Sequence, residues 1–204
     1  MSPFNPRQRN TLSGQITIAL YRITQAIDVL LRERGKLMHL SPTQIETLLF
    51  LKYARPGVRT IGGLAYRLQA TYATASGVAD ALEGKRLIQR VPSLEDQRVI
   101  TIRLTPHGDR TTEMLEDVLD LLAGAVDALP EAEQAALLHA VQGIVRRLQQ
   151  AGYVRVYEMC WGCQFFRKDA HPDDPRGPHH CAFMDAPLPA ANTYLECPDF
   201  VPAA

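Results

Sequence analysis

The sequence lacks any long hydrophobic run. No apolar stretch approaches the ~20 residues that a transmembrane helix needs, although 46% of the residues are hydrophobic and 22% are charged. This composition is that of an ordinary soluble protein and excludes the membrane and disordered classes. The first ten residues, MSPFNPRQRN, contain no apolar signal region, so we expect a cytoplasmic protein with no membrane partner.

Cysteine is absent from the first 159 residues, because all four cysteines lie between positions 160 and 197. In a reducing compartment a structural disulfide is disfavoured, so metal binding or redox chemistry becomes the leading explanation for these thiols. The composition also changes after Gly152, where seven prolines fall in a loop-rich tail. We therefore predict two parts, residues 1–152 and residues 153–204.

The chain also lacks net charge, which by itself gives no reason to expect a nucleic-acid partner. The charges are unevenly placed, however. Residues 1–51 carry a net charge of +3 and residues 52–110 carry +5, whereas residues 111–154 carry −5 and residues 155–204 carry −3. A basic middle between acidic flanks is typical of a DNA-reading segment, although chance clustering on a solvated surface gives the same pattern.

Apolar residues recur every three or four positions along several segments, which predicts a mainly α-helical protein. Ser41-Pro42 and Thr105-Pro106 each indicate the start of a helix, with an N-cap residue followed by proline at the first helical position. Gly35 is expected to end the first helix, and Pro130 to separate the last two. The helices predicted outside the central segment cover about residues 12–34, 42–55, 105–129 and 131–150.

The central segment has a different pattern, with two short helices and then two strands. Thr60 is placed to cap the first short helix, and Thr71 follows a brief turn as the N-cap of the second. Strands are predicted over 87–91 and 99–104, since apolar and polar residues alternate there. This order describes a winged helix-turn-helix at about residues 59–104. Its second helix can enter the major groove of DNA, and its hairpin can reach the backbone or the minor groove.

Several short motifs follow one another in a fixed order through and beyond this segment. They are Leu64-Ala65, Ala79-Asp80-Ala81-Leu82-Glu83, Leu87-Ile88-Gln89-Arg90, Asp96-Gln97-Arg98 and Arg103-Leu104-Thr105-Pro106-His107-Gly108. The ordered combination of a D-x-R wing with an L-T-x-x-G exit is specific, although each motif alone is weak. With these motifs the chain resembles the MarR family of bacterial regulators over roughly residues 12–150.

The resemblance implies an obligate homodimer, joined by the first helix and the last two, that reads a pseudo-palindromic operator in double-stranded DNA. It also implies that Arg98 is the minor-groove arginine and that Asp96 holds the wing in shape. The groove-facing residues of the recognition helix would be Thr71, Tyr72, Ala73, Ser76 and Gly77. Two features depart from the family pattern: Gly77 stands where many relatives carry a large polar or basic residue, and Gly84-Lys85-Arg86 replaces the usual lysine-glycine helix end.

Structural explanations exist for the same residues. Thr71 can act as a cap worth about 1 kcal/mol to its helix; we expect it to be both a cap and a neighbour of a phosphate. Asp96 and Arg98 can form an exposed salt bridge that contributes roughly 0–1 kcal/mol. In a hairpin that directly follows a helix-turn-helix, DNA contact is the favoured interpretation.

The tail carries a Cys-x2-Cys turn, and its four cysteines are Cys160, Cys163, Cys181 and Cys197. Such a turn brings two sulfurs onto one metal, and two later cysteines complete a tetrahedral site. A structural Zn²⁺ is the favoured occupant. An iron–sulfur cluster is the alternative, because Cys197 precedes a proline as many cluster ligands do, and thiol redox switching is a third possibility. His171, His179 and His180 are interpreted as surface or outer residues, with His180 the candidate for a substitute ligand.

The leading functional hypothesis is a transcriptional regulator whose tail senses a metal, a cluster or oxidation and thereby shifts DNA affinity. In a milder version the tail is purely structural, and a small phenolic or acidic effector binds between helices. We do not expect an enzyme. The rival in that class is a thiol–disulfide oxidoreductase using Cys160 and Cys163, whose active site should open a helix after a strand.

Overall fold

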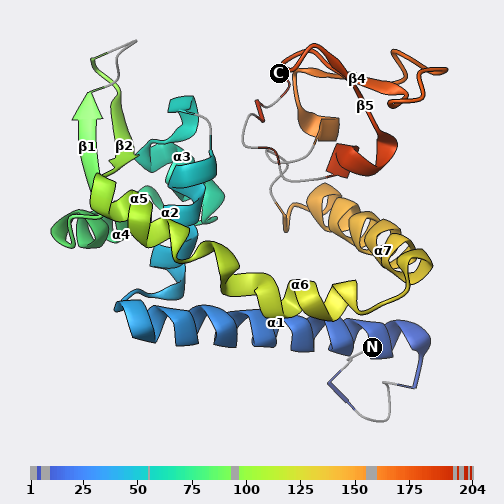
Figure 1. Ribbon diagram of the computed structural model, residues 1–204, viewed down its shortest axis with the longest axis horizontal. Coiled ribbons are helices and arrows are strands. Elements are labelled where there is room, and N and C mark those ends of the chain that lie inside the picture. Colours follow the sequence, from blue (N-terminus) through green and yellow to red (C-terminus); the bar gives the residue numbers. More distant parts are fainter. Residues whose placement is uncertain are drawn as a thin grey trace.

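The computed structural model shows a mainly helical molecule with a two-stranded wing and a small second sheet (Figure 1). It describes residues 4–5, 10–54, 56–92, 97–154, 160–194, 197, 200, 201 and 203. None of the described helices combines the length and the apolar content that a membrane span requires. The elements up to the tail are α1 (Leu12–Met38), α2 (Pro42–Tyr53), η1 (Pro56–Val58), α3 (Ile61–Arg67), α4 (Tyr72–Gly84), β1 (Ile88–Pro92), β2 (Ile100–Leu104), α5 (Pro106–Glu113), η2 (Glu116–Leu119), α6 (Asp120–Asp127) and α7 (Glu131–Gln150).

The hydrophobic core is centred on α2, which contacts α1, α4, α5 and β2. Its Ile45, Leu48 and Leu51 are fully buried, and each such side chain stabilises the fold by about 1.5–3 kcal/mol relative to an exposed one. The helix begins as predicted at Ser41, whose hydroxyl accepts a hydrogen bond from the backbone N–H of Gln44. The Gln44 side chain bonds back to the Ser41 N–H, which completes a capping box.

The first helix is longer than predicted, because it passes through Gly35 and ends at Met38. The true end is marked by His39, whose φ of 55° is left-handed and whose N–H bonds to the Gly35 carbonyl. Gly35 is instead needed because the chain after the helix packs closely against it. A Cβ atom there would lie 2.2 Å from the Leu40 carbonyl oxygen, so only glycine lets the chain fold back this closely over the helix.

The single long helix predicted over about 105–129 is wrong, since the structure divides it into α5, η2 and α6. At the break the Leu115 N–H donates to the Thr112 carbonyl, three residues back, and this tighter winding turns Leu115 and Val118 into the core. The carbonyl of Met114 receives a hydrogen bond from Arg34 of α1 instead, at 2.9 Å. The break therefore depends on a residue that lies 80 positions earlier in the chain.

The tail contains a three-stranded antiparallel sheet in the order β3-β4-β5. The sequence predicted a loop-rich tail and missed this sheet, because strands of two or three residues are too short to show alternation. In Figure 1 the tail lies at the opposite end of the view from the wing, beside α7. The division near residue 153 stays a prediction. The elements of the tail are η4 (Cys160–Gly162), β3 (Phe166–Arg167), β4 (His179–Cys181), β5 (Ala186–Leu188) and η5 (Ala190–Tyr194).

Candidate functional site

Helix α4 follows α3 after a four-residue turn, and the two helices pack directly against each other. The inner face of α4 is fixed by Ala75, Ala79 and Leu82, all fully buried. The residues predicted to face DNA lie on the remaining surface: Thr71, Tyr72, Ala73 and Gly77 are exposed, and Ser76 is half-buried. The arrangement leaves a continuous outer face at the start of α4.

The prediction that Thr71 caps α4 is confirmed. Its hydroxyl accepts a hydrogen bond from the Thr74 N–H at 3.1 Å and lies 2.8 Å from the Thr74 hydroxyl. Its proximity to a DNA phosphate stays a prediction. Beside it, Tyr72 is 65% exposed in the first turn of the helix, where a phenol can donate a hydrogen bond to a phosphate or a base edge.

Gly77 stands in open space, because a Cβ built on it meets no heavy atom within 4 Å. The departure from the family pattern at this position is therefore not caused by crowding from the protein. A helix whose outer face carries no side chain here can approach another surface closely.

The wing is an antiparallel pair in which Ile88 lies opposite Leu104 and Arg90 opposite Ile102. Ile102 also donates to the Arg59 carbonyl at 2.6 Å, which ties β2 to the segment before α3. Arg98 lies in a turn between the strands and is exposed. Asp96, its predicted partner in the wing, lies outside the described residues.

Sequence reasoning missed the role of Arg90, which joins the recognition helix to the wing. Its guanidinium pairs with Asp80 at 2.7 Å and Glu83 at 2.5 Å, and it donates to the Ser76 carbonyl at 3.3 Å. Burial alone lowers the pKa of Arg90, but the hydrogen bonds that Arg90 donates to Asp80 and Glu83 outweigh it and leave the pKa above its usual value. The pairing also offsets the negative charges of Asp80 and Glu83. An arginine in a strand, seven residues after a helix-ending glutamate, was the available signal.

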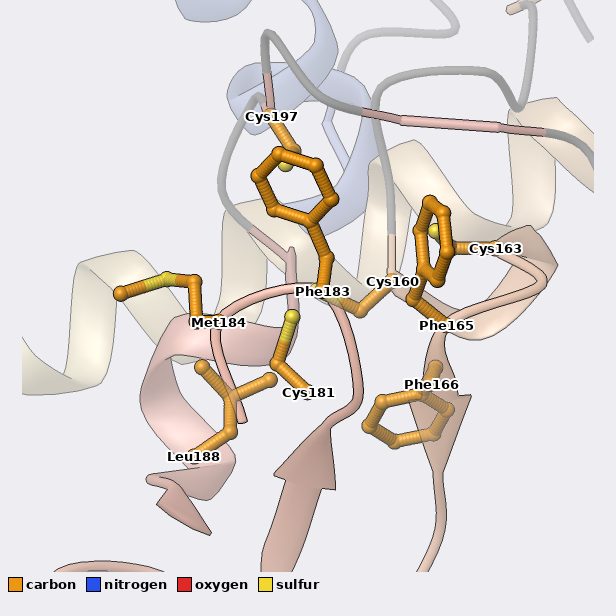
Figure 2. A pocket seen from close by; sticks show the side chains of 9 residues that line it. All are labelled: Cys160, Cys163, Phe165, Phe166, Cys181, Phe183, Met184, Leu188 and Cys197. Atoms are coloured by element: carbon orange, nitrogen blue, oxygen red, sulfur yellow. The ribbon is translucent and has the colours of Figure 1, made fainter. Parts of the chain in front are cut away.

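The four cysteines converge on one cavity in the tail, with an almost wholly apolar lining (Figure 2). They come from separate stretches of chain: Cys160 begins η4, Cys163 follows it, Cys181 ends β4 and Cys197 lies beyond η5. The Cys-x2-Cys turn is closed by a hydrogen bond from the Cys163 N–H to the Cys160 carbonyl at 2.9 Å. The other lining residues are Phe165, Phe166, Phe183, Met184 and Leu188.

The thiols are close enough to affect one another electrostatically. Burial, followed by the neighbouring Cys197, Cys163 and Cys181, raises the pKa of the Cys160 thiol to about 11. Several thiolates in such a place need a cation among them to exist together. Within the described residues no three His, Cys, Asp or Glu side chains already stand around a single ion position. The donor set of four thiols nevertheless fits a metal centre by its chemistry.

The histidines are held away from this cavity. The His171 Nε2 and His180 Nδ1 atoms lie 3.0 Å apart, and the other ring nitrogen of His180 lies 3.4 Å from Asp185. His179 is buried and its Nδ1 accepts a hydrogen bond from the Asp169 N–H at 3.1 Å. The cavity lining does not include any of these rings, which supports the interpretation of His180 as an outer residue.

Comparison with known proteins agrees with the winged helix-turn-helix. Residues 40–100 match the model of the MarR family. The HTH-type transcriptional repressor MdtR of Bacillus subtilis (strain 168) is 28% identical over 146 residues, which are 71% of this chain and 90% of the relative.

Solved structures have the same fold. The transcriptional regulator BldR from Sulfolobus solfataricus is 26% identical with a TM-score of 0.52, over 65% of this chain and 94% of that one. MepR of S. aureus in complex with DNA is 25% identical with a TM-score of 0.54, over 68% and 99%. A MarR family protein from Bacillus stearothermophilus reaches a TM-score of 0.58 at 20% identity, over 72% and 99%, and shows the fold alone.

Proposed function

We propose that this chain is a transcriptional regulator of the MarR family, and that it is a homodimer that binds a pseudo-palindromic operator and changes its DNA affinity with the state of its cysteine tail. The match of residues 40–100 to the MarR family model and the similarity to the repressor MdtR support the family. The observation that carries the proposal is the continuous outer face of α4 held beside an arginine-bearing wing. The fold of MepR, which was solved with DNA bound, supports the same use of these elements.

The DNA-reading part of the proposal rests on rigidity and charge. Arg90 fixes α4 and β1 as one unit, so the helix and the wing can meet adjacent grooves together. Residues 52–110 carry a net charge of +5, which supplies the counterion-releasing contacts that dominate affinity for DNA.

Dimer formation is supported by the exposed apolar side chains of α1, α6 and α7. Neither α6 nor α7 contains a buried residue, although both are amphipathic. An isolated helix with this pattern needs a partner to cover its apolar face. The exposed apolar residues of α1, α6 and α7 include Leu12, Ile16, Ile23, Leu121, Leu137, Leu138, Ile144 and Leu148.

A link between the tail and the dimerisation helices supports the switching part. The guanidinium of Arg146 in α7 lies 4.8 Å from the centre of the Trp161 ring, within the range of a cation–π contact. Trp161 follows Cys160 directly in the sequence and is itself part of the Cys-x2-Cys turn. A ligand that reshapes this turn would therefore act on α7, and through α7 on the spacing of the two recognition helices.

The first experiment tests DNA reading with the full chain and a duplex selected from a random pool. Replacing Arg98 by alanine should lower the affinity for DNA at least about tenfold. It should also reduce the slope of log K against the logarithm of salt concentration by about one for each lost phosphate contact. The matched control is Arg32→Ala, which removes the same charge from α1, where Arg32 pairs with Asp28. Equal affinity of the two variants would contradict the proposed role of the wing.

The second experiment compares DNA affinity for the metal-loaded, metal-free and oxidised forms of the unmodified chain. The switching proposal predicts that these forms differ. Identical affinities would leave the tail as a structural element and favour the milder alternative, in which a small phenolic or acidic effector binds between helices.

The thiol–disulfide oxidoreductase alternative has no support in the structure. Cys160 opens a three-residue turn and not a long helix after a strand, and the raised pKa of its thiol is opposite to that of an activated nucleophile. At the family level the chain is a transcription regulator and not an enzyme.

A further inference from the structure

All four cysteines line a single cavity in the tail, so the kind of metal centre that suits this cavity can be considered from its walls. A Zn²⁺ ion binds four thiolates at about 2.3 Å, which requires all the sulfurs to lie about 4 Å apart around one point. In the described residues no three His, Cys, Asp or Glu side chains are grouped around one ion position, yet all four cysteines line the same cavity. Figure 2 shows Cys181 and Cys197 on opposite sides of it in this view. The four cysteines therefore surround a shared cavity and are not gathered at one ion position.

Backbone hydrogen bonds hold the segments that carry the cysteines. Cys181 is paired in register with Phe166 across β3 and β4, and the Ala182 N–H donates to the Phe165 carbonyl at 2.8 Å. The end of the chain crosses the same loop, since Gln164 donates to the Val201 carbonyl at 2.8 Å and Ala203 donates to the Gly162 carbonyl at 2.9 Å. These backbone bonds fix the spacing of the walls.

Aromatic and aliphatic groups fill the rest of the wall. The rings of Phe165 and Phe183 lie 5.4 Å apart, and Trp161 packs against Phe166 at 4.9 Å. Among the described residues, no charged or histidine side chain lines the cavity. Such a shell limits the access of water and controls the potential of a polynuclear iron site, whereas a structural zinc site has no redox state to protect.

Positive charge stands just outside this apolar shell. The Arg146 guanidinium carbon lies 4.8 Å from the centre of the Trp161 ring, and the Lys168 Nζ atom lies 5.6 Å from it. Trp161 directly follows Cys160 in the chain. A [4Fe–4S]²⁺ core with four thiolates carries a net charge of −2, so these two cations would offset it from the second layer. A cubane core also gives each iron one terminal cysteine, which suits four sulfurs that reach the cavity separately.

We propose that the tail binds a [4Fe–4S] cluster through Cys160, Cys163, Cys181 and Cys197, and not the Zn²⁺ ion that the sequence alone favours. The inference rests on the proposed function only in taking the tail to be a metal centre. It names the occupant, and it assigns Trp161, Phe165, Phe166 and Phe183 to the shell that shields it.

The test is anaerobic purification of the full chain, with iron, acid-labile sulfide and zinc measured per chain and the visible spectrum recorded. We expect a brown protein with about four iron and four sulfide per chain, and a loss of the visible band in Cys160→Ser and Cys197→Ser. The control His180→Ala should keep the band, and circular dichroism should show that all three variants retain their helices. Zinc near one per chain in a colourless protein, or only two irons per chain, would overturn the proposal.

The outcome is separable from that of the DNA experiments. A brown, cluster-loaded protein that selects no DNA would contradict the regulator proposal and support the cluster proposal. A colourless zinc protein that binds its operator would contradict the cluster proposal and support the regulator proposal.

Discussion

Arg86 adopts a left-handed backbone conformation, with a φ of 57°. It follows the last residue of α4 and its C-cap, where the family pattern has glycine near the helix end. A residue with a Cβ atom costs roughly 1–2 kcal/mol in this region of φ/ψ space. The Thr105 hydroxyl bonds to the Arg86 carbonyl at 2.7 Å, so the surrounding structure holds the conformation in place.

Replacing Arg86 by glycine is therefore expected to stabilise the protein by about 1 kcal/mol. Urea denaturation followed by circular dichroism measures this as a higher midpoint with an unchanged slope. The control is Gln89→Gly on β1, an exposed residue with ordinary φ, which should lower the midpoint because glycine weakens a strand. A midpoint for Arg86→Gly at or below that of the unmodified protein would show that the conformation carries no cost.

At the same scale, the sequence predicted residue types better than residue partners. Thr60, Thr71 and Thr105 are all N-caps, as the patterns indicated, because a cap is a local interaction within three residues. The partners of Arg34 and Arg90 could not be predicted from the sequence, since those contacts form only after separate segments pack together.

Between elements, the main connection at the candidate site is the one that Arg90 makes from β1 to α4. The Arg90 side chain is about three-quarters shielded, at 23% relative exposure, while the side chains of Asp80 and Glu83 are 64% and 40% exposed. Solvent screening on the carboxylate side limits the value of such pairs, but the three partners together fix the angle between wing and helix.

The Arg90→Met variant keeps the aliphatic stem and removes the pairs. We expect a loss of about 1 kcal/mol in stability together with weaker DNA binding, because the wing and the recognition helix lose their fixed angle. The comparison is Arg103→Met, on the neighbouring strand opposite Gln89, which is exposed and should keep its stability. Unchanged stability and DNA affinity in Arg90→Met would remove Arg90 from the account.

The break between α5 and α6 shows why element boundaries exceed what the sequence can predict. The apolar spacing of residues 105–129 is compatible with one helix, and Thr105-Pro106 opens it as expected. The change to three-residue hydrogen bonds near Leu115 is stabilised by Arg34 and by burial in the core. Winged helix-turn-helix elements were predicted to within a residue or two, because their caps, turns and alternation are all local.

At the scale of the whole molecule, helices α1, α6 and α7 expose apolar side chains that the proposed dimer would cover. Replacing Leu121 and Leu138 together by glutamate should convert the proposed dimer to a monomer and abolish operator binding, since only a dimer spans two half-sites. Light scattering after size exclusion measures the mass. The control Val99→Glu places the same charge on an exposed apolar residue of the wing and should remain dimeric. A dimeric double variant would place the interface elsewhere.

The proposed communication between the tail and the DNA-binding region also belongs to the scale of the whole molecule, and Arg146 is the residue that tests it. In Arg146→Leu the tail should still bind its metal or cluster, but DNA affinity should respond less to whether it is loaded. Arg147→Leu, the adjacent exposed residue of α7, is the matched control and should keep the full response. An equal response in both variants would exclude the Arg146–Trp161 contact as the connection.

The most direct test of the account is selection of bound duplexes from a random DNA pool by the full-length protein. We expect enrichment of a pseudo-palindrome whose half-sites lie about 10–10.5 base pairs apart or a multiple of that spacing. The Arg98→Ala variant should enrich the same sequence more weakly. A pool that shows no enriched sequence, or a single motif with no inverted repeat, would contradict the claim that this chain reads DNA as a dimer.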